Sequence, residues 1–356
     1  MLKISCLLTV KDLPIMIFRS ALVFSLLLSL VACGRSEEPS GPELVVYSSR
    51  IEQLIKPIFD QYTAETGVNI RYVTDSAGPL LARLRAEGEN TPADILVTVD
   101  VGNLWQAAQQ GLLAAQTSSV LNNNVPESLR DPEGRWTGLS IRARTIVYSS
   151  ERVKPEALSS YEALAEPQWA GRLCLRTAKK VYNQSLVATM ISADGAENTE
   201  RVLGAWVDNL AVPPFSSDNK VIEAIAAGQC DVGIVNTYYL ARMKADDPSL
   251  PVDLFWANQT GEAPFNRGVH VNISGAGVTA ASKQKALAMS LLEWLSEADA
   301  QHAFAELNQE FPVNRNTPPS SLLQHWGDFK ADQVPVVEAG RLQAEAIRMM
   351  DRVGYR

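Results

Sequence analysis

The sequence predicts an α/β fold in two lobes that are joined by crossing strands. Short apolar strands and amphipathic helices alternate over residues 44–110, and a second alternation of the same kind covers residues 161–235. Apolar segments at 136–148 and 270–278 follow these two sets and are placed to cross between lobes. Alternating strands and helices are typical of a sheet of parallel strands covered by helices.

Each element follows from hydrophobic periodicity and from glycine or proline at its ends. The first set has strands at 44–47, 68–73 and 94–99, and helices at 51–66, 78–87 and 101–110. The second has segments at 161–164, 173–175, 184–193, 197–210 and 220–227 and a strand at 231–235, with a strand pair before it at 136–139 and 145–148. Helices at 283–295 and 299–307 and one amphipathic helix at 336–353 follow the strand at 270–278.

From this order we expect a first lobe of residues 43–143 and about 268–323, and a second lobe of residues 144–267 and 324–356. Ligands of such sheets bind where strands end and helices begin. We therefore expect a binding cleft between the lobes.

The N-terminus is predicted to be a targeting segment. Residues 21–32 are almost entirely apolar and are too short to span a bilayer. The segment ends in Leu-Val-Ala before Cys33, which resembles a bacterial lipobox in which Cys33 is lipidated. A signal peptide without lipidation is the alternative. We expect residues 1–32 to be the signal, with 1–15 upstream of the true start, and residues 33–42 to be a tether.

Composition and cysteine usage narrow the function further. The formal net charge of −8 argues against nucleic acid, whose binding needs basic clusters. Cys174 and Cys230 remain after the targeting segment, and an even pair in an exported chain favours a disulfide. Two buried free thiols are the alternative.

Three tyrosines stand at predicted junctions between strand or loop and helix. Tyr238 and Tyr239 follow the strand at 231–235, and Tyr182 begins the helix that includes 184–193. Paired tyrosines are often half-buried residues with no further role. Our hypothesis is that the three phenols converge on one Fe(III) ion, because these junctions are where ligands bind.

Several stretches together resemble a known family. They are Val46–Arg50, Pro92–Asp100, Gly138–Arg144, Leu173–Arg176, Tyr182–Ala188, Asn236–Leu240, His270–Val278 and Gly327–Lys330. With these stretches the chain resembles the bacterial Fe(III)-binding substrate-binding proteins of ABC transporters, of the FbpA and FutA type. The resemblance covers nearly the whole mature chain.

The resemblance implies a two-lobed periplasmic-binding-protein fold of type II, with two crossing hinge strands. It implies a periplasmic monomer that delivers ferric iron to an inner-membrane ABC permease, here with a lipid anchor at Cys33. It also implies a disulfide between Cys174 and Cys230 and a clamp of Tyr182, Tyr238 and Tyr239.

This sequence departs from the family at the His-Tyr pair that often follows the first strand, where Ile51 and Glu52 stand instead. Glu52 is either a ligand from the first lobe or a solvated acid in the first turn of its helix. Arg142 matches the residue with which some members hold carbonate. The alternative for Arg142 is a structural ion pair at the hinge.

The chemistry of iron agrees with this donor set. Fe(III) is a hard cation that prefers charged oxygen ligands. Three phenolates would cancel its charge, and carbonate or another synergistic anion, water or Glu52 could complete the coordination.

Other functions are compatible with a two-lobed fold of this kind. The same fold could carry a polyamine, thiamine or an oxyanion, although such sites use acidic-aromatic boxes or backbone amides. A sensory lipoprotein that binds the metal without importing it is a further alternative. No Ser-His-Asp set, HExxH helix or nucleophile elbow indicates an enzyme.

Overall fold

A long strand shared by two halves of one sheet organises the protein. The computed structural model describes residues 41–262 and 265–356. The predicted signal peptide, Cys33 and most of the tether lie outside these residues. Residues Glu43–Arg356 form one unit, which is described here by itself.

The strands are β1 (Glu43–Ser48), β2 (Asn69–Thr74), β3 (Ile95–Thr98), β4 (Thr137–Ser149), β5 (Leu173–Cys174), β6 (Val232–Asn236), β7 (Val252–Phe255) and β8 (Val271–Val278). Their order in the sheet is β2-β1-β3-β8-β4-β6-β5, and β7 also pairs with β4. The pairs β1–β2, β1–β3 and β5–β6 are parallel, as the alternation of strands and helices predicted. β8 and β4 run antiparallel to their neighbours.

The helices before β6 are α2 (Glu52–Thr66), α3 (Ala77–Glu87), α4 (Val101–Gln109), α5 (Ser119–Asn124), α6 (Val181–Asp194), α7 (Ala196–Asp208) and α8 (Asp218–Ala226). Those after β6 are α9 (Thr237–Asp246), α10 (Lys285–Leu295), α11 (Ala298–Asn308), α12 (Ser321–Gln324), α13 (Val337–Arg341) and α14 (Gln343–Arg352). Within the described residues, no helix has the length and apolar character that a bilayer crossing requires.

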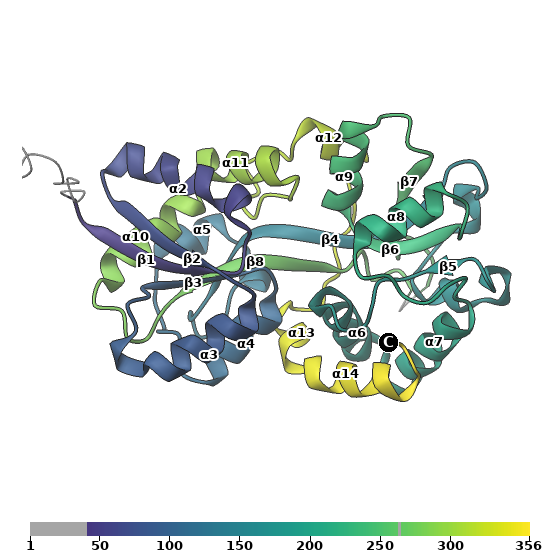
Figure 1. Ribbon diagram of the computed structural model, residues 1–356, viewed down its shortest axis with the longest axis horizontal. Helices are drawn as coiled ribbons and strands as arrows, with labels where there is room; N and C mark the ends of the chain where they lie inside the picture. Colours follow the sequence, from purple (N-terminus) through teal and green to yellow (C-terminus); the bar gives the residue numbers. More distant parts are fainter. Residues whose placement is uncertain (1–40, 263–264) are drawn as a thin grey trace, which may run out of the picture. The chain divides into compact units, whose positions relative to one another are not determined.

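β4 connects the two halves (Figure 1). Its first part, up to Ala143, pairs with β8, and its second part, from Arg144 on, pairs with β6 and β7. The predicted strand pair at 136–139 and 145–148 is therefore wrong. The two segments form one strand, because the residues between them are largely buried and continue the extended backbone.

The hydrophobic residues form separate cores on either side of this connection. The first core is built from residues 44–139 with 273–339, and the second from residues 146–257 with 346–355. Independent cores on one chain are what two lobes require.

The C-terminal segment also differs from the prediction. A single helix was expected at 336–353, but the helix breaks at Leu342 into α13 and α14. The break changes the packing partners: α13 packs against α4 and α6, whereas α14 packs against α6 and α7. Figure 1 shows both helices in yellow beside α6.

Candidate metal-binding site

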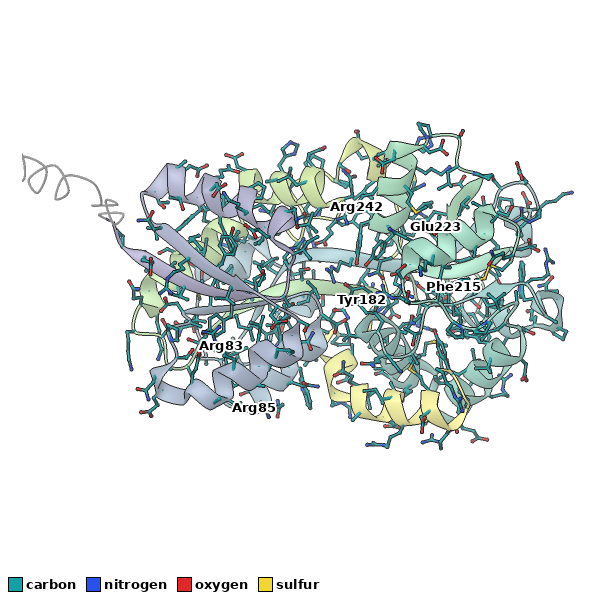
Figure 2. All side chains as sticks on the ribbon, viewed as in Figure 1. Arg83, Arg85, Tyr182, Phe215, Glu223 and Arg242 are labelled. Atoms are coloured by element: carbon teal, nitrogen blue, oxygen red, sulfur yellow. A yellow bond between two sulfur atoms is a disulfide. The ribbon has the colours of Figure 1, made fainter. Side chains whose placement is uncertain are left out.

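The three tyrosines stand at the beginnings of two helices. Tyr182 is the second residue of α6, and Tyr238 and Tyr239 are the second and third residues of α9. β6 is buried along its whole length and leads directly into α9, so the strand fixes where this helix starts. Figure 2 labels Tyr182, which lies at the start of α6. These positions agree with the predicted junctions.

The three phenols, here called the phenol row, lie close together. Tyr182 and Tyr238 are near enough that each shifts the pKa of the other, and so are Tyr238 and Tyr239. The ring centroids of Tyr238 and Tyr239 are 4.4 Å apart. Asn236 Nδ2 donates to the Tyr238 hydroxyl at 3.1 Å. Tyr182 and Tyr238 are only 8% and 4% exposed, so these two side chains are largely withdrawn from water, whereas Tyr239 is half-buried.

Cationic side chains surround the phenols. The Lys180 ammonium lies 4.7 Å from the centroid of the Tyr182 ring. The Arg142 guanidinium lies 5.3 Å from that centroid and 5.5 Å from the Tyr238 centroid. Arg242 lies 5.1 Å from the Tyr238 centroid. Positive charge at such distances favours the phenolate over the phenol.

The charges affect the three tyrosines differently. Burial acts to raise the pKa of Tyr182, but attraction to Arg142 and Lys180 outweighs it and lowers this pKa below its ordinary value near 10. Burial and then repulsion from Tyr182 raise the pKa of Tyr238 well above that value, and they also raise the pKa of Tyr239. The second and third phenols therefore need a further positive charge before they ionise.

A buried polar scaffold holds the two helix starts together. Arg144 donates to Asn236 Oδ1 at 3.1 Å, at the end of β6, and to Asn183 Oδ1 at 2.6 Å, in the first turn of α6. It also pairs with Asp218 at 3.1 Å, and Arg176 pairs with the same carboxylate at 2.9 Å. No role for Arg144, Arg176, Asn183, Asn236 or Asp218 was predicted from the sequence. Side chains alternate between the two faces of a strand, so the sequence could have predicted that Arg142 and Arg144 lie on one face of β4. No local sequence pattern could have singled out Asp218.

Arg142 is engaged in ion pairing. Its Nε donates to Glu310 at 3.2 Å, and one of its terminal amino groups donates to the Val99 carbonyl. Glu310 also pairs with Arg50 at 3.0 Å and accepts from the Ser140 hydroxyl. Arg142 thus lies beside the tyrosines while bonded to the first lobe.

Glu52 stands apart from this cluster. It is the exposed first residue of α2, and it accepts a hydrogen bond from the hydroxyl of Tyr72, on β2, at 2.9 Å. The contacts found for Glu52 in the described part of the chain lie within the first lobe.

The disulfide between Cys174 and Cys230 is present, with an S–S distance of 2.05 Å and Cα atoms 5.9 Å apart. It connects the end of β5 to the turn before β6. The predicted pairing is confirmed, and the bond anchors the strand that leads into α9.

Comparison with known proteins gives the family. A family model described as bacterial extracellular solute-binding protein matches residues 90–328. The chain belongs to this family. The predicted two-lobed periplasmic-binding-protein fold is confirmed by the close structural likenesses, and the family is one of transport proteins rather than enzymes.

Relatives of this solute-binding protein carry names that refer to iron. Iron uptake protein A1 of Synechocystis is 38% identical over 342 residues, which cover 92% of this chain and 93% of the relative. Iron uptake protein A2 of the same organism is 42% identical over 316 residues, covering 87% and 89%. A Trichodesmium FutA structure, described as a complex with iron and citrate ligands, has a TM-score of 0.83 and 41% identity, covering 88% of this chain and all of the other.

The expected resemblance to the ferric-binding proteins is therefore confirmed at the level of the family.

Proposed function

We propose that this solute-binding protein binds ferric iron between its lobes and delivers it to an ABC importer, with Tyr182, Tyr238 and Tyr239 as the metal ligands. The observation that carries the proposal is the close approach of three phenols at two helix starts, two of them buried and one half-buried, beside Arg142 and Lys180. The names of the Synechocystis iron uptake proteins and the iron and citrate of the FutA complex support it.

The pKa pattern supports a trivalent cargo. Tyr182 is already shifted toward phenolate by Arg142 and Lys180, whereas the pKa values of Tyr238 and Tyr239 are raised. A metal that binds there must displace the protons of the phenols. Fe(III) supplies more charge for this purpose than a divalent ion, and it prefers hard oxygen donors. The three phenolates balance the charge of the ion.

The remaining coordination positions belong to small ligands in this proposal. Carbonate or another synergistic anion would bind near Arg142 and the start of α6, where a helix N-terminus favours negative charge. Arg142 would have to exchange its bond to Val99 for the anion. Glu52 would have to leave Tyr72 to become a ligand, so we propose it only as a contributor after lobe movement.

The proposed partner is an inner-membrane permease, and the proposed location is the periplasm. We propose that the protein acts as a monomer and that lipid at Cys33 attaches it to a membrane. Mass spectrometry of the membrane fraction, with Cys33→Ser as the comparison, tests the anchor.

The metal site is tested by a ferric citrate titration of the purified protein. A phenolate-to-iron charge-transfer band should give the mixture a reddish colour. Tyr239→Phe removes one phenolate donor and should weaken the band and the affinity strongly, whereas Glu52→Ala should change the affinity less.

Tyr148→Phe is the matched control, because Tyr148 is a buried tyrosine of β4 in the same lobe that lies outside the phenol row. It should leave the band unchanged. A colourless wild-type mixture, together with tight binding of a polyamine, would contradict the proposal.

A further inference from the structure

A buried hydrogen bond joins the two lobes beside the tyrosines. Asp100 is the N-cap of α4, whose apolar residues belong to the first core. Ser185 lies on α6, whose neighbouring Leu186 and Val187 belong to the second core. The Ser185 hydroxyl donates to the Asp100 carboxylate, with distances of 3.0 and 2.9 Å to its two oxygens. Both side chains are completely buried.

The carboxylate is fixed from its own side. Asp100 Oδ1 accepts from the Gly102 backbone N–H at 2.8 Å, and Oδ2 accepts from Asn272 Nδ2, on hinge strand β8, at 2.9 Å. Among the partners of this carboxylate in the described residues, Ser185 is the one carried by the second lobe. If the lobes separate here, the bond from Ser185 to Asp100 must break.

Ser185 is coupled to the metal site through its helix. It follows Tyr182 by three residues on α6, so the two side chains lie on neighbouring positions of one helix face. A bond that holds Ser185 against the first lobe therefore also limits how far Tyr182 can move away from it.

A second polar bridge runs parallel to the first. Gln343, at the start of α14, accepts from Gln106 Nε2 on α4 at 3.0 Å and donates to Gln184 Oε1 on α6 at 3.4 Å. The adjoining α13 packs so closely on α4 that a Cβ atom on Gly340 would lie 2.5 Å from the Trp105 Cβ. Two polar bridges, one direct and one through Gln343, thus connect α4 to α6.

We propose that Ser185 and Asp100 are positioning residues that latch α6 to α4 and so control how fast bound metal is released. The proposal rests on the proposed iron-binding function. Hydrogen bonds to an ionised acceptor are stronger than those between neutral groups. Opening the latch would exchange the Ser185 donor for water, so it would lose the net free energy of one charge-assisted hydrogen bond. The latch therefore favours the arrangement in which the tyrosines are covered.

Ser185→Ala tests the latch, since it removes the crossing hydroxyl and leaves the tyrosines in place. We expect iron to pass from Ser185→Ala to an excess of EDTA about tenfold faster than from the wild type. The position of the charge-transfer band should not change, because no ligand is altered. Small-angle X-ray scattering of the metal-free protein should show a larger radius of gyration for the variant.

Thr189→Val is the matched control. Its buried hydroxyl lies one turn further along α6 and donates to the Ser185 carbonyl within the same helix. Thr189→Val should release iron and scatter like the wild type. Gln343→Leu removes the second bridge and should also speed release, which keeps the test informative if Ser185→Ala does not fold.

Equal release rates for the wild type and both bridge variants would overturn the latch, as would equal acceleration by Thr189→Val. If the wild type binds no iron, the proposed function fails instead. The scattering of the metal-free proteins then still decides whether Ser185 holds the lobes together.

Discussion

At the scale of single residues, the three tyrosines are chemically unequal. Tyr182 lies among cations that lower its pKa, while Tyr238 and Tyr239 keep raised pKa values. In the proposed site, this inequality would give an order to metal binding. A ferric ion would first bind the phenol that ionises most readily, and its charge would then favour loss of the other two protons.

The role of Lys180 follows from this order. Lys180→Gln removes a cation 4.7 Å from the Tyr182 ring, so the pKa of Tyr182 should rise and iron affinity at neutral pH should fall several-fold. An ultraviolet titration of phenolate formation and a citrate competition assay measure the two effects. Lys179→Gln, at the exposed neighbouring position, should change neither. Equal effects of the two substitutions would contradict this role, because they would show that the net charge of the protein, and not the position of Lys180, sets the pKa of Tyr182.

The lowered pKa of Glu310 predicts how the stability of the fold depends on pH. Burial acts to raise its pKa, but Arg50 and Arg142, with hydrogen bonds from Arg50 and Ser140, lower it to about 2. A carboxyl group whose folded pKa is depressed stabilises the fold above its unfolded pKa of about 4. That contribution is lost as the pH falls from about 4 through 2.

Glu310→Gln should therefore lower the free energy of unfolding by roughly 3 kcal/mol at neutral pH, because it leaves two buried arginines without their anion. The loss should shrink as the pH falls toward 2. Urea unfolding at several pH values measures it. Glu306→Gln is the control, because Glu306 is an exposed acid on α11, just before Glu310 in the chain. A loss for Glu310→Gln that does not change with pH would contradict the assignment.

At the scale of the elements, local sequence patterns predicted most strands and helices but not their long-range partners. The parallel strands β1, β2 and β3 and the helices between them followed from periodicity and from Gly67. Two features did not follow. The continuity of β4 depends on pairing with β8 at one end and with β6 at the other. The break at Leu342 depends on α13 fitting between α4 and α6.

A substitution at Gly340 tests how closely α13 fits against α4. A methyl group at Gly340 would overlap the Trp105 side chain, so Gly340→Ala should cost roughly 1–3 kcal/mol of unfolding free energy by overpacking. Gly204 is a helical glycine of α7 with open space around its Cβ position. Gly204→Ala should therefore be neutral or slightly stabilising. Thermal unfolding compares the two. Equal stability of the two variants would contradict the packing of α13.

At the scale of the whole molecule, the sequence predicted where the three tyrosines stand in the fold, but not which residues surround them. The three tyrosines could be selected because they stand where strands or loops lead into helices. Arg144, Asp218 and Glu310 could not be selected in the same way. Their ion-pair partners lie far away in the sequence, on other elements. Their roles therefore depend on how each lobe folds.

The fold suits a site that would both hold and release an ion. β4 and β8 connect the two cores, and buried polar contacts such as that of Ser185 with Asp100 lie between the lobes. In the proposed function, closure of the lobes would cover the tyrosines, and opening would return them to water.

The central claim is that three phenolate oxygens share one ferric ion. Anomalous diffraction at the iron edge from crystals of the iron-loaded protein tests it most directly. The account predicts one strong anomalous peak within bonding distance of the hydroxyl oxygens of Tyr182, Tyr238 and Tyr239. A peak bound elsewhere, or a peak that any of the three oxygens cannot reach, would contradict it.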